Sequence, residues 1–347
     1  MRAALLPTPG DPYITAAWLN HYKKVWKDEV DKLYIHFNSR LEDPIITYSF
    51  QLAEQAGADY SYDRQWKGHG EALRVIFDRS PEDHIVFVED DAYVRFPGIM
   101  DDCFKRVEDG RVDAVTNPRG SVGMDVMAQE QRVFGLKGDE FHKPNFWPCF
   151  FFAHRNIFDN TDKDFACKNW YPGDVIPQLN NYEVASNQSG DTFSWMSIQL
   201  RAEGKKFFQI EDGRSTTQDY WLYDMKSGIF ANPPVAPWIH FGSTSSGISN
   251  SLLDDDFKPL ENRAGSPPTA LPTMPDDHIR DDYARRISLW YLCWKHFQIP
   301  ESHPAAYFNK VYGDALERLI DGCQIDRDRI MRYNQIYMDA LGFVFND

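Results

Sequence analysis

Strand and helix patterns alternate through the first hundred residues, and this alternation limits the folds that are open to the chain. Short apolar runs, typical of strands covered on both faces, occur at 3–8, 32–37 and 84–89. Between them, 14–25 and 44–56 repeat apolar residues at helical spacing. Strands that alternate with helices predict an α/β fold, in which a mostly parallel central sheet lies between helices.

The pattern is less regular beyond residue 112. A short strand is expected at 113–116 and a central strand at 146–154, which is intensely apolar. The polar, glycine-punctuated stretch 119–143 predicts a long surface loop. A helix at 192–202 and a strand at 206–211 follow.

The last part of the chain has a different organisation. Residues 253–278 are rich in Asp, Pro, Ser and Gly, which is typical of a linker. Three helical patterns follow, so we expect an α/β domain at 1–252 and a helical region at 279–347. The first of these helices carries an aromatic stripe that includes Trp290 and Trp294, and we expect the stripe to be core.

Composition excludes some partners. The formal net charge of −15 disfavours nucleic acid and anionic lipid, but a nucleotide whose charge is offset by a divalent cation is not disfavoured. The five cysteines are scattered without a CxxC pair, which favours a reducing compartment. The apolar run before Pro7 is too short for a signal peptide, and no run is long enough to cross a membrane. We therefore expect a cytoplasmic protein.

Three consecutive acidic residues, Glu89, Asp90 and Asp91, begin at the last position of the strand expected at 84–89. Because side chains alternate along a strand, Glu89 and Asp91 should point to one side and Asp90 to the other. Ligands of such sheets bind beyond the carboxyl ends of the strands. Two carboxylates placed there can hold Mg²⁺ or Mn²⁺ with positions left for a diphosphate. An acidic turn without a ligand is the alternative.

These residues, in this context, resemble the GT-A glycosyltransferases, whose acidic DxD motif follows an apolar strand. The motif reads ExD here, with Glu89, Asp90 and Asp91. The resemblance covers about residues 1–250 and implies that 1–252 is a catalytic domain. It implies that Glu89 and Asp91 bind Mn²⁺ or Mg²⁺ and that Glu89 and Asp90 contact the nucleotide. Glutamate at the first position leaves the division of roles between Glu89 and Asp90 open, so Asp91 is the most secure metal ligand.

Other segments match the same family in the same order. Pro7 and Thr8 leave the first strand where the family often contacts the nucleotide base, although a simple turn is the alternative. Gly68 lies in a glycine-rich stretch before the helix that precedes the acidic motif, where the family often contacts the donor. A glycine backbone can approach a ligand closely. A plain helix-entry loop is the alternative there.

Two later residues complete the resemblance. Asp191 lies in Gly190-Asp191-Thr192 and matches the general base of inverting members, with Glu183 as a weaker candidate. Asp191 is also a suitable helix N-cap, a role that would keep its carboxylate weakly basic. His240 matches a late histidine that completes the metal site, with a buried core histidine as the alternative.

The resemblance implies transfer of a sugar from a nucleotide-sugar, most simply a UDP-sugar, to an acceptor hydroxyl. A saccharide or a protein is the expected acceptor, and inversion or retention of configuration stays open. The alternatives are a sugar nucleotidyltransferase and a non-catalytic carbohydrate-binding relative of the fold. The C-terminal helices match no family, and they could cover apolar surface, bind the acceptor or form a homo-oligomer.

Overall fold

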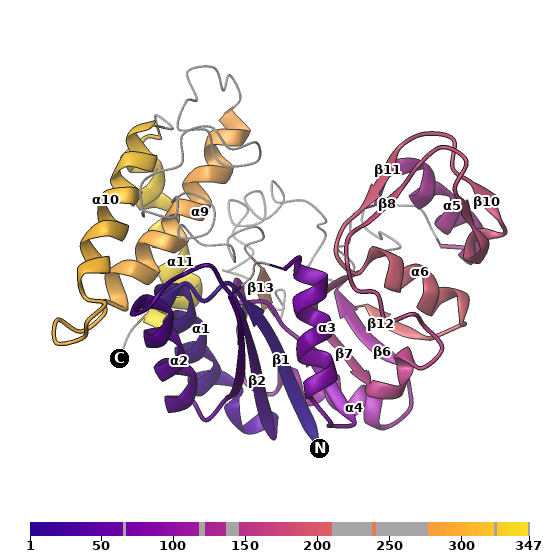
Figure 1. The fold of residues 1–347 in the computed structure, drawn as a ribbon, viewed down its shortest axis with the longest axis horizontal. Helices are drawn as coiled ribbons and strands as arrows, with labels where there is room; N and C mark the ends of the chain where they lie inside the picture. The colour runs from indigo at the N-terminus through magenta and orange to yellow at the C-terminus, as the bar shows by residue number, and fades with distance from the viewer. Residues whose placement is uncertain are drawn as a thin grey trace.

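A computed structural model describes residues 1–64, 67–117, 122–136, 146–209, 238–240, 277–322 and 325–345. Within these ranges the centre is a seven-stranded sheet in the order β12-β6-β7-β4-β1-β2-β3 (Figure 1). Only the pairs that β7 makes with β4 and β6 are antiparallel, so the predicted mostly parallel sheet is confirmed. The strands are β1 (Arg2–Thr8), β2 (Lys32–Asn38), β3 (Asp59–Asp63), β4 (His84–Phe87), β6 (Ala114–Asn117), β7 (Trp147–His154) and β12 (Phe207–Gln209).

Helices cover both faces of this sheet because its strands are apolar on both sides. Along β1, Ala4 and Leu6 belong to one hydrophobic cluster, and Ala3 and Leu5 belong to the other, as alternation requires. The first face carries α1 (Pro12–Val25), α2 (Ile45–Gln55) and α4 (Ile99–Glu108), and the second carries α3 (His69–Arg79) and α6 (Ser194–Ala202).

The start of α1 shows how the sequence sets a local structure. Asp11 accepts hydrogen bonds from the backbone N–H groups of Tyr13 and Ile14, and Pro12 occupies the first helical position. A carboxylate cap followed by proline stabilises a helix N-terminus, because it satisfies free N–H groups and pre-sets the backbone angle. These two residues therefore set the start of α1, just before the apolar repeat at 14–25 that predicts the helix.

A small outlying layer lies beside the sheet and has its own apolar cluster, which includes Val126, Trp170 and Ile176. The helix α5 in this layer corrects the expectation of a loop at 119–143, because residues 124–134 are helical; residues 118–121 and 137–145 lie outside the described part. The layer consists of α5 (Met124–Phe134), β8 (Lys168–Trp170), β9 (Val175–Ile176), the 3-10 helix η3 (Pro177–Leu179), β10 (Tyr182–Glu183) and β11 (Gln188–Gly190). Two further 3-10 helices are η1 (Lys27–Glu29) and η2 (Arg155–Phe158).

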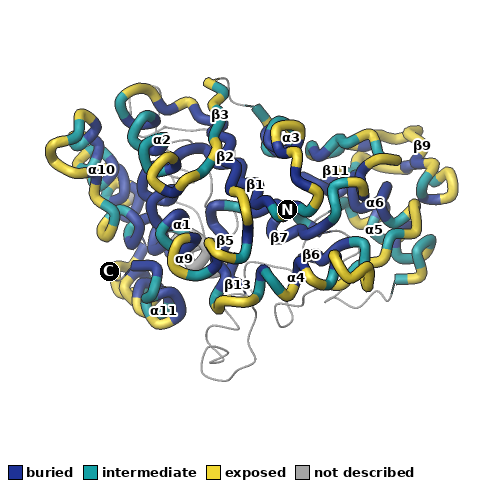
Figure 2. The backbone as a smooth tube through the Cα atoms, turned by 90° about the horizontal axis from the view of Figure 1, so that it is seen from below, coloured by how far each residue is buried: buried dark blue, intermediate teal, exposed yellow. Residues whose placement is uncertain are grey.

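The C-terminal helices α9 (Asp277–His296), α10 (Tyr307–Gly322) and α11 (Arg327–Phe345) pack together against α1 (Figures 1 and 2). Their apolar residues belong to the same hydrophobic cluster as one face of the sheet, and the aromatic stripe, with Trp290 buried, is core as expected. Trp294 packs against this cluster and is half-buried, so the described part of the stripe gives no support to the expected homo-oligomer. Of the expected linker at 253–278, residues 253–276 lie outside the described part of the chain, and residues 277 and 278 belong to α9.

A two-stranded ribbon extends from the edge of the sheet at which β4 ends. Its strands are β5 (Ala92–Val94) and β13 (Trp238–His240), which pair antiparallel with His240 opposite Ala92. This pairing joins the end of the acidic motif to a residue almost 150 positions later in the chain. No helix in the described part of the chain is long and apolar enough to cross a membrane.

Candidate active site

The acidic motif and the late histidine meet at the carboxyl edge of the sheet. Nε2 of His240 lies 2.8 Å from Oε2 of Glu89 and 3.3 Å from Oδ1 of Asp91. Glu89 and Asp91 therefore face the same group, as the alternation along the strand predicted. The indole N–H of Trp18 donates to the backbone carbonyl of Glu89 at 3.0 Å, which holds this turn against α1.

The geometry of this group fits a divalent cation. His240 is 4% exposed; its Nε2 faces the two carboxylates, and its Nδ1 has no hydrogen-bond partner within the described residues. Two ligand atoms at about 2.1 Å from one ion lie about 3.0 Å apart at a right angle and about 3.4 Å apart at a tetrahedral angle. The separations of Nε2 from the two carboxylates are close to these values. The donor set of two carboxylates and an imidazole suits Mn²⁺ or a similar ion.

The electrostatics of His240 follow from the same neighbours. Burial alone lowers the pKa of an imidazole, but the carboxylates of Asp91 and Glu89 outweigh burial and raise the pKa of His240 to about 9. Without a cation, the imidazolium would balance part of the acidic charge. A bound cation would replace that proton with a larger positive charge.

Asp90 points away from this group, as alternation predicted. Its Oδ2 accepts a 2.5 Å hydrogen bond from the hydroxyl of Thr8, which in turn accepts from the backbone N–H of Gly10. Burial, aided by the charge of Asp91, raises the pKa of the Asp90 carboxyl well above its usual value. Asp90 is fully buried, and its hydrogen bond with Thr8 joins the end of β4 to the end of β1. Contact of Pro7, Thr8 or Asp90 with a nucleotide stays a prediction.

Asn38, the last residue of β2, is hydrogen-bonded to the segment that precedes α3. The side chain of Asn38 donates to the carbonyl of Lys67 at 2.6 Å and accepts from its N–H at 2.8 Å. Gly68 follows, exposed, and a Cβ built on it would meet nothing within 4 Å, so its backbone is open to a ligand. His69 lies beside the acidic group, with Nε2 3.8 Å from Oε1 of Glu89.

Asp191 belongs to the same site through Trp147, the first residue of β7. The indole N–H of Trp147 donates to Oδ2 of Asp191 at 3.1 Å, and its ring packs edge-on against the imidazole of His240 with centroids 4.9 Å apart. The alternative role of Asp191 as a helix N-cap is wrong. The N-cap residue of α6 is Phe193, and the Asp191 side chain accepts from the adjacent N–H of Thr192 instead.

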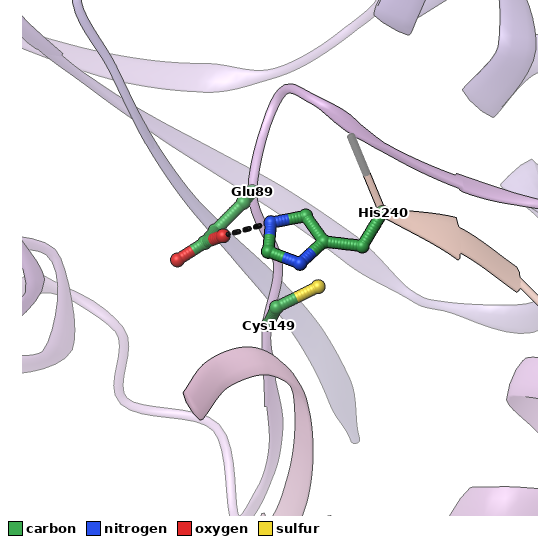
Figure 3. Close-up of side chains that lie close together, drawn as sticks. All are labelled: Glu89, Cys149 and His240. Atoms are coloured by element: carbon green, nitrogen blue, oxygen red, sulfur yellow. Dashed lines mark ion pairs between the residues drawn. The ribbon is translucent and has the colours of Figure 1, made fainter. Parts of the chain in front are cut away.

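Cys149 is a site residue that sequence reasoning missed. One ligand atom from each of Glu89, Cys149 and His240 lies within 4.8 Å of the other two (Figure 3). Trp147 and His69 were also not identified as site residues. The alternating pattern does not reveal that β7 runs antiparallel, and only that direction brings its first residues to the edge where β4 ends.

The weaker candidate for a base lies elsewhere. Glu183 is exposed on β10, where it pairs with Val175 of β9 in the outlying layer. Of the two candidate bases, it is therefore Asp191, not Glu183, that is linked to the acidic motif, through Trp147 and His240.

No family model matches the sequence, and no curated protein matches it significantly. Among solved structures, the chain is similar to S. aureus TarS, with a TM-score of 0.38 and 11% identity over 97% of this chain and 55% of that chain, so it spans about half of TarS. TarS 1–349 in complex with UDP-GlcNAc has a TM-score of 0.39 and 10% identity over 96% of this chain and 91% of that chain. Glucosyl-3-phosphoglycerate synthase from Mycobacterium tuberculosis, in complex with Mn²⁺, UDP-glucose and phosphoglyceric acid, has a TM-score of 0.35 and 17% identity over 46% of this chain and 58% of that chain. Likeness at this level carries no donor, acceptor or metal over to this chain.

Proposed function

We propose that this chain is a metal-dependent glycosyltransferase that moves a sugar from a nucleotide-sugar to an acceptor hydroxyl. The observation that supports this proposal is the convergence of Glu89, Asp91 and His240 at the carboxyl edge of a mostly parallel sheet. This edge is where α/β proteins bind their ligands. The resemblance of the acidic motif to that of GT-A enzymes gives the reaction class.

The proposed roles follow from the positions. Glu89, Asp91 and His240 would hold Mn²⁺ or Mg²⁺. When bound, the cation offsets the negative charge that develops on the departing nucleoside diphosphate. Gly68 would let the donor approach the backbone before α3. The buried pair of Thr8 and Asp90 would keep the strand exits in place beneath the nucleotide.

Asp191 is the proposed general base. Its carboxylate would take the proton of the acceptor hydroxyl while the oxygen attacks the anomeric carbon of the sugar. The bond from that carbon to the diphosphate oxygen breaks, and its electron pair leaves with the diphosphate. Trp147 orients this carboxylate by its hydrogen bond to Oδ2. A base placed in this way favours inversion of configuration at the anomeric carbon.

The donor class rests on the resemblance alone, which favours a UDP-sugar. The acceptor is proposed as a saccharide or a protein hydroxyl, since the net charge of −15 opposes a nucleic acid. No feature of the described residues selects between these two acceptors.

The test is hydrolysis of a panel of UDP-sugars and GDP-sugars by the full chain with Mn²⁺ and without an acceptor, because water can replace a missing hydroxyl. The expected result is slow, Mn²⁺-dependent release of a nucleoside diphosphate and a free sugar. Release of pyrophosphate from a nucleoside triphosphate and a sugar phosphate would favour a sugar nucleotidyltransferase. Saccharide binding with no turnover of any donor would favour a carbohydrate-binding protein.

A further inference from the structure

The thiol of Cys149 lies beside the proposed cation site, with its sulfur within 4.8 Å of a ligand atom of Glu89 and of His240. Cys149 is fully buried, and Figure 3 shows its sulfur beside the imidazole of His240, with the carboxylate of Glu89 on another side of the ring. Carboxylates, imidazole and water suit Mg²⁺ and Mn²⁺, whereas a thiolate selects softer ions such as Zn²⁺ or Co²⁺. A thiolate ligand at this position would therefore change which cation the site prefers.

An unusual backbone conformation brings Cys149 to this position. Phe150 has a φ of 53°, in the left-handed region that a bulky residue seldom adopts, and the pairing of β6 with β7 shifts register at this point. Side chains of consecutive strand residues normally face opposite sides of a sheet. Here, Cys149 and Phe150 belong to the same hydrophobic cluster, so the left-handed residue has turned the thiol toward the side that carries β13.

The same residue anchors the strand that carries the histidine. The ring of Phe150 packs against Trp238 of β13 with centroids 4.6 Å apart, two residues before His240. The bulge in β7 and the position of β13 are thus coupled, and together they bring sulfur, imidazole and carboxylate within 4.8 Å of one another. Two ligands on opposite sides of one ion lie about 4.4 Å apart, so small side-chain shifts would bring all three into one coordination sphere.

A second observation points to a ligand at this place. His240 is more than nine-tenths buried; its Nε2 is paired with the carboxylates of Glu89 and Asp91, whereas its Nδ1 has no hydrogen-bond partner within the described residues. Buried imidazole nitrogens are normally satisfied, because an unmade hydrogen bond costs about 1–3 kcal/mol. A cation bound to Nδ1 would remove that cost.

We propose that Cys149 is a ligand of this cation site, together with Glu89 and His240, and that the site prefers a divalent cation with affinity for sulfur over Mg²⁺. With Asp91, the site would have four protein ligands, and an ion that takes five or six ligands keeps a position open for a substrate. The proposal uses the position of the cation site in the proposed function, but it does not depend on sugar transfer.

The test is electronic absorption of the full chain, freed of metal by a chelator and then titrated with Co²⁺. A thiolate ligand gives a sulfur-to-cobalt charge-transfer band in the near ultraviolet, which oxygen and nitrogen ligands do not give. The expected result for the unaltered chain is this band, saturating at one equivalent and persisting in excess Mg²⁺. Absence of the band when Co²⁺ is bound would overturn the proposal, whatever the variants do.

The variants identify which sulfur is responsible. Cys149→Ser should abolish the band and weaken Co²⁺ binding by at least about tenfold, the lower end of the loss caused by removing an outer-shell partner of a metal. Cys103→Ser makes the same change at a buried thiol in α4 and should keep the band. A band that survives in Cys149→Ser would contradict the proposal, since another thiol would then bind the ion.

The two proposals fail separately. Turnover of a UDP-sugar without a sulfur-to-cobalt band would leave the glycosyltransferase assignment standing and would make Cys149 a core residue beside the imidazole. A sulfur-to-cobalt band without turnover of any nucleotide-sugar would support the ligand role of Cys149 and contradict the proposed enzyme.

Discussion

The indole N–H of Trp147 donates a 3.1 Å hydrogen bond to the carboxylate of Asp191, so the first residue of β7 orients the proposed base. Trp147→Phe removes this bond but keeps an aromatic ring against His240. Hydrogen bonds to charged groups contribute about 1.5–3 kcal/mol, so donor hydrolysis should slow by about tenfold or more. Steady-state hydrolysis and UDP binding by calorimetry check this, and binding should be unchanged. Equal losses in rate and in UDP affinity would contradict a positioning role.

Asp191→Asn tests the base directly. The amide is the same size as the carboxylate and can still accept from Trp147, but it cannot take a proton. General-base catalysis typically contributes 10²–10⁴-fold, so the hydrolysis rate should fall by about 100-fold or more. The melting temperature should stay within a few degrees of the unaltered chain, because the Asp191 side chain does not cap α6. A parallel fall in melting temperature and rate would indicate a structural role instead.

Gly70 and Gly68 provide a matched pair in the entry to α3. A Cβ at Gly70 would lie 2.3 Å from the backbone of Ala166, whereas one at Gly68 would meet nothing within 4 Å. Gly70→Ala should therefore destabilise the chain by about 1–3 kcal/mol, as overpacking does, and Gly68→Ala should be close to neutral. Urea unfolding measures both changes. If the donor approaches Gly68 as proposed, Gly68→Ala should weaken donor binding, and unchanged binding would contradict that contact.

Much of the sheet could be predicted from the sequence, because β1, β2 and β4 are buried on both faces and read as apolar runs. The helix α5 could not be predicted in this way. Its buried positions include Gln129 and Glu130, so the apolar periodicity that marks a packed helix is missing. The short strands β8 to β11 have two or three residues each and leave no periodic signal.

The candidate site was predictable in part. Alternation along the strand placed Glu89 and Asp91 together, and order along the chain suggested His240, which the structure brings within 3.3 Å of both. Cys149 was not predictable, because its direction depends on the left-handed backbone at Phe150 and on the antiparallel direction of β7. Neither of these properties has a signature in the residue types.

Acid should destabilise the chain through a buried histidine in α1. Burial lowers the pKa of His21 to about 3, although its hydrogen bond with the Val94 carbonyl opposes the shift. The unfolded chain therefore binds a proton below about pH 6.5 that the folded chain does not bind, and stability falls as pH falls.

This linkage has a defined size. Between pH 7 and pH 5, the free energy of unfolding should fall by about 2 kcal/mol because of His21 alone. Urea unfolding at both pH values measures it, with His21→Gln as the comparison, since glutamine does not titrate. The variant should be less stable at pH 7 but should lose about 2 kcal/mol less on acidification. The same pH dependence in both chains would contradict this assignment.

The account depends on a cation that couples the acidic motif to a diphosphate, and UDP affinity tests that coupling most directly. The measurement is calorimetric titration of UDP into the unaltered chain and into Asp91→Ala, each with Mn²⁺ and with a chelator. The account predicts that Mn²⁺ tightens UDP binding by about tenfold or more in the unaltered chain, worth about 1.4 kcal/mol, and that Asp91→Ala stays folded but loses this dependence. Equal UDP affinity with and without Mn²⁺ in the unaltered chain, or a full Mn²⁺ effect in Asp91→Ala, would contradict it.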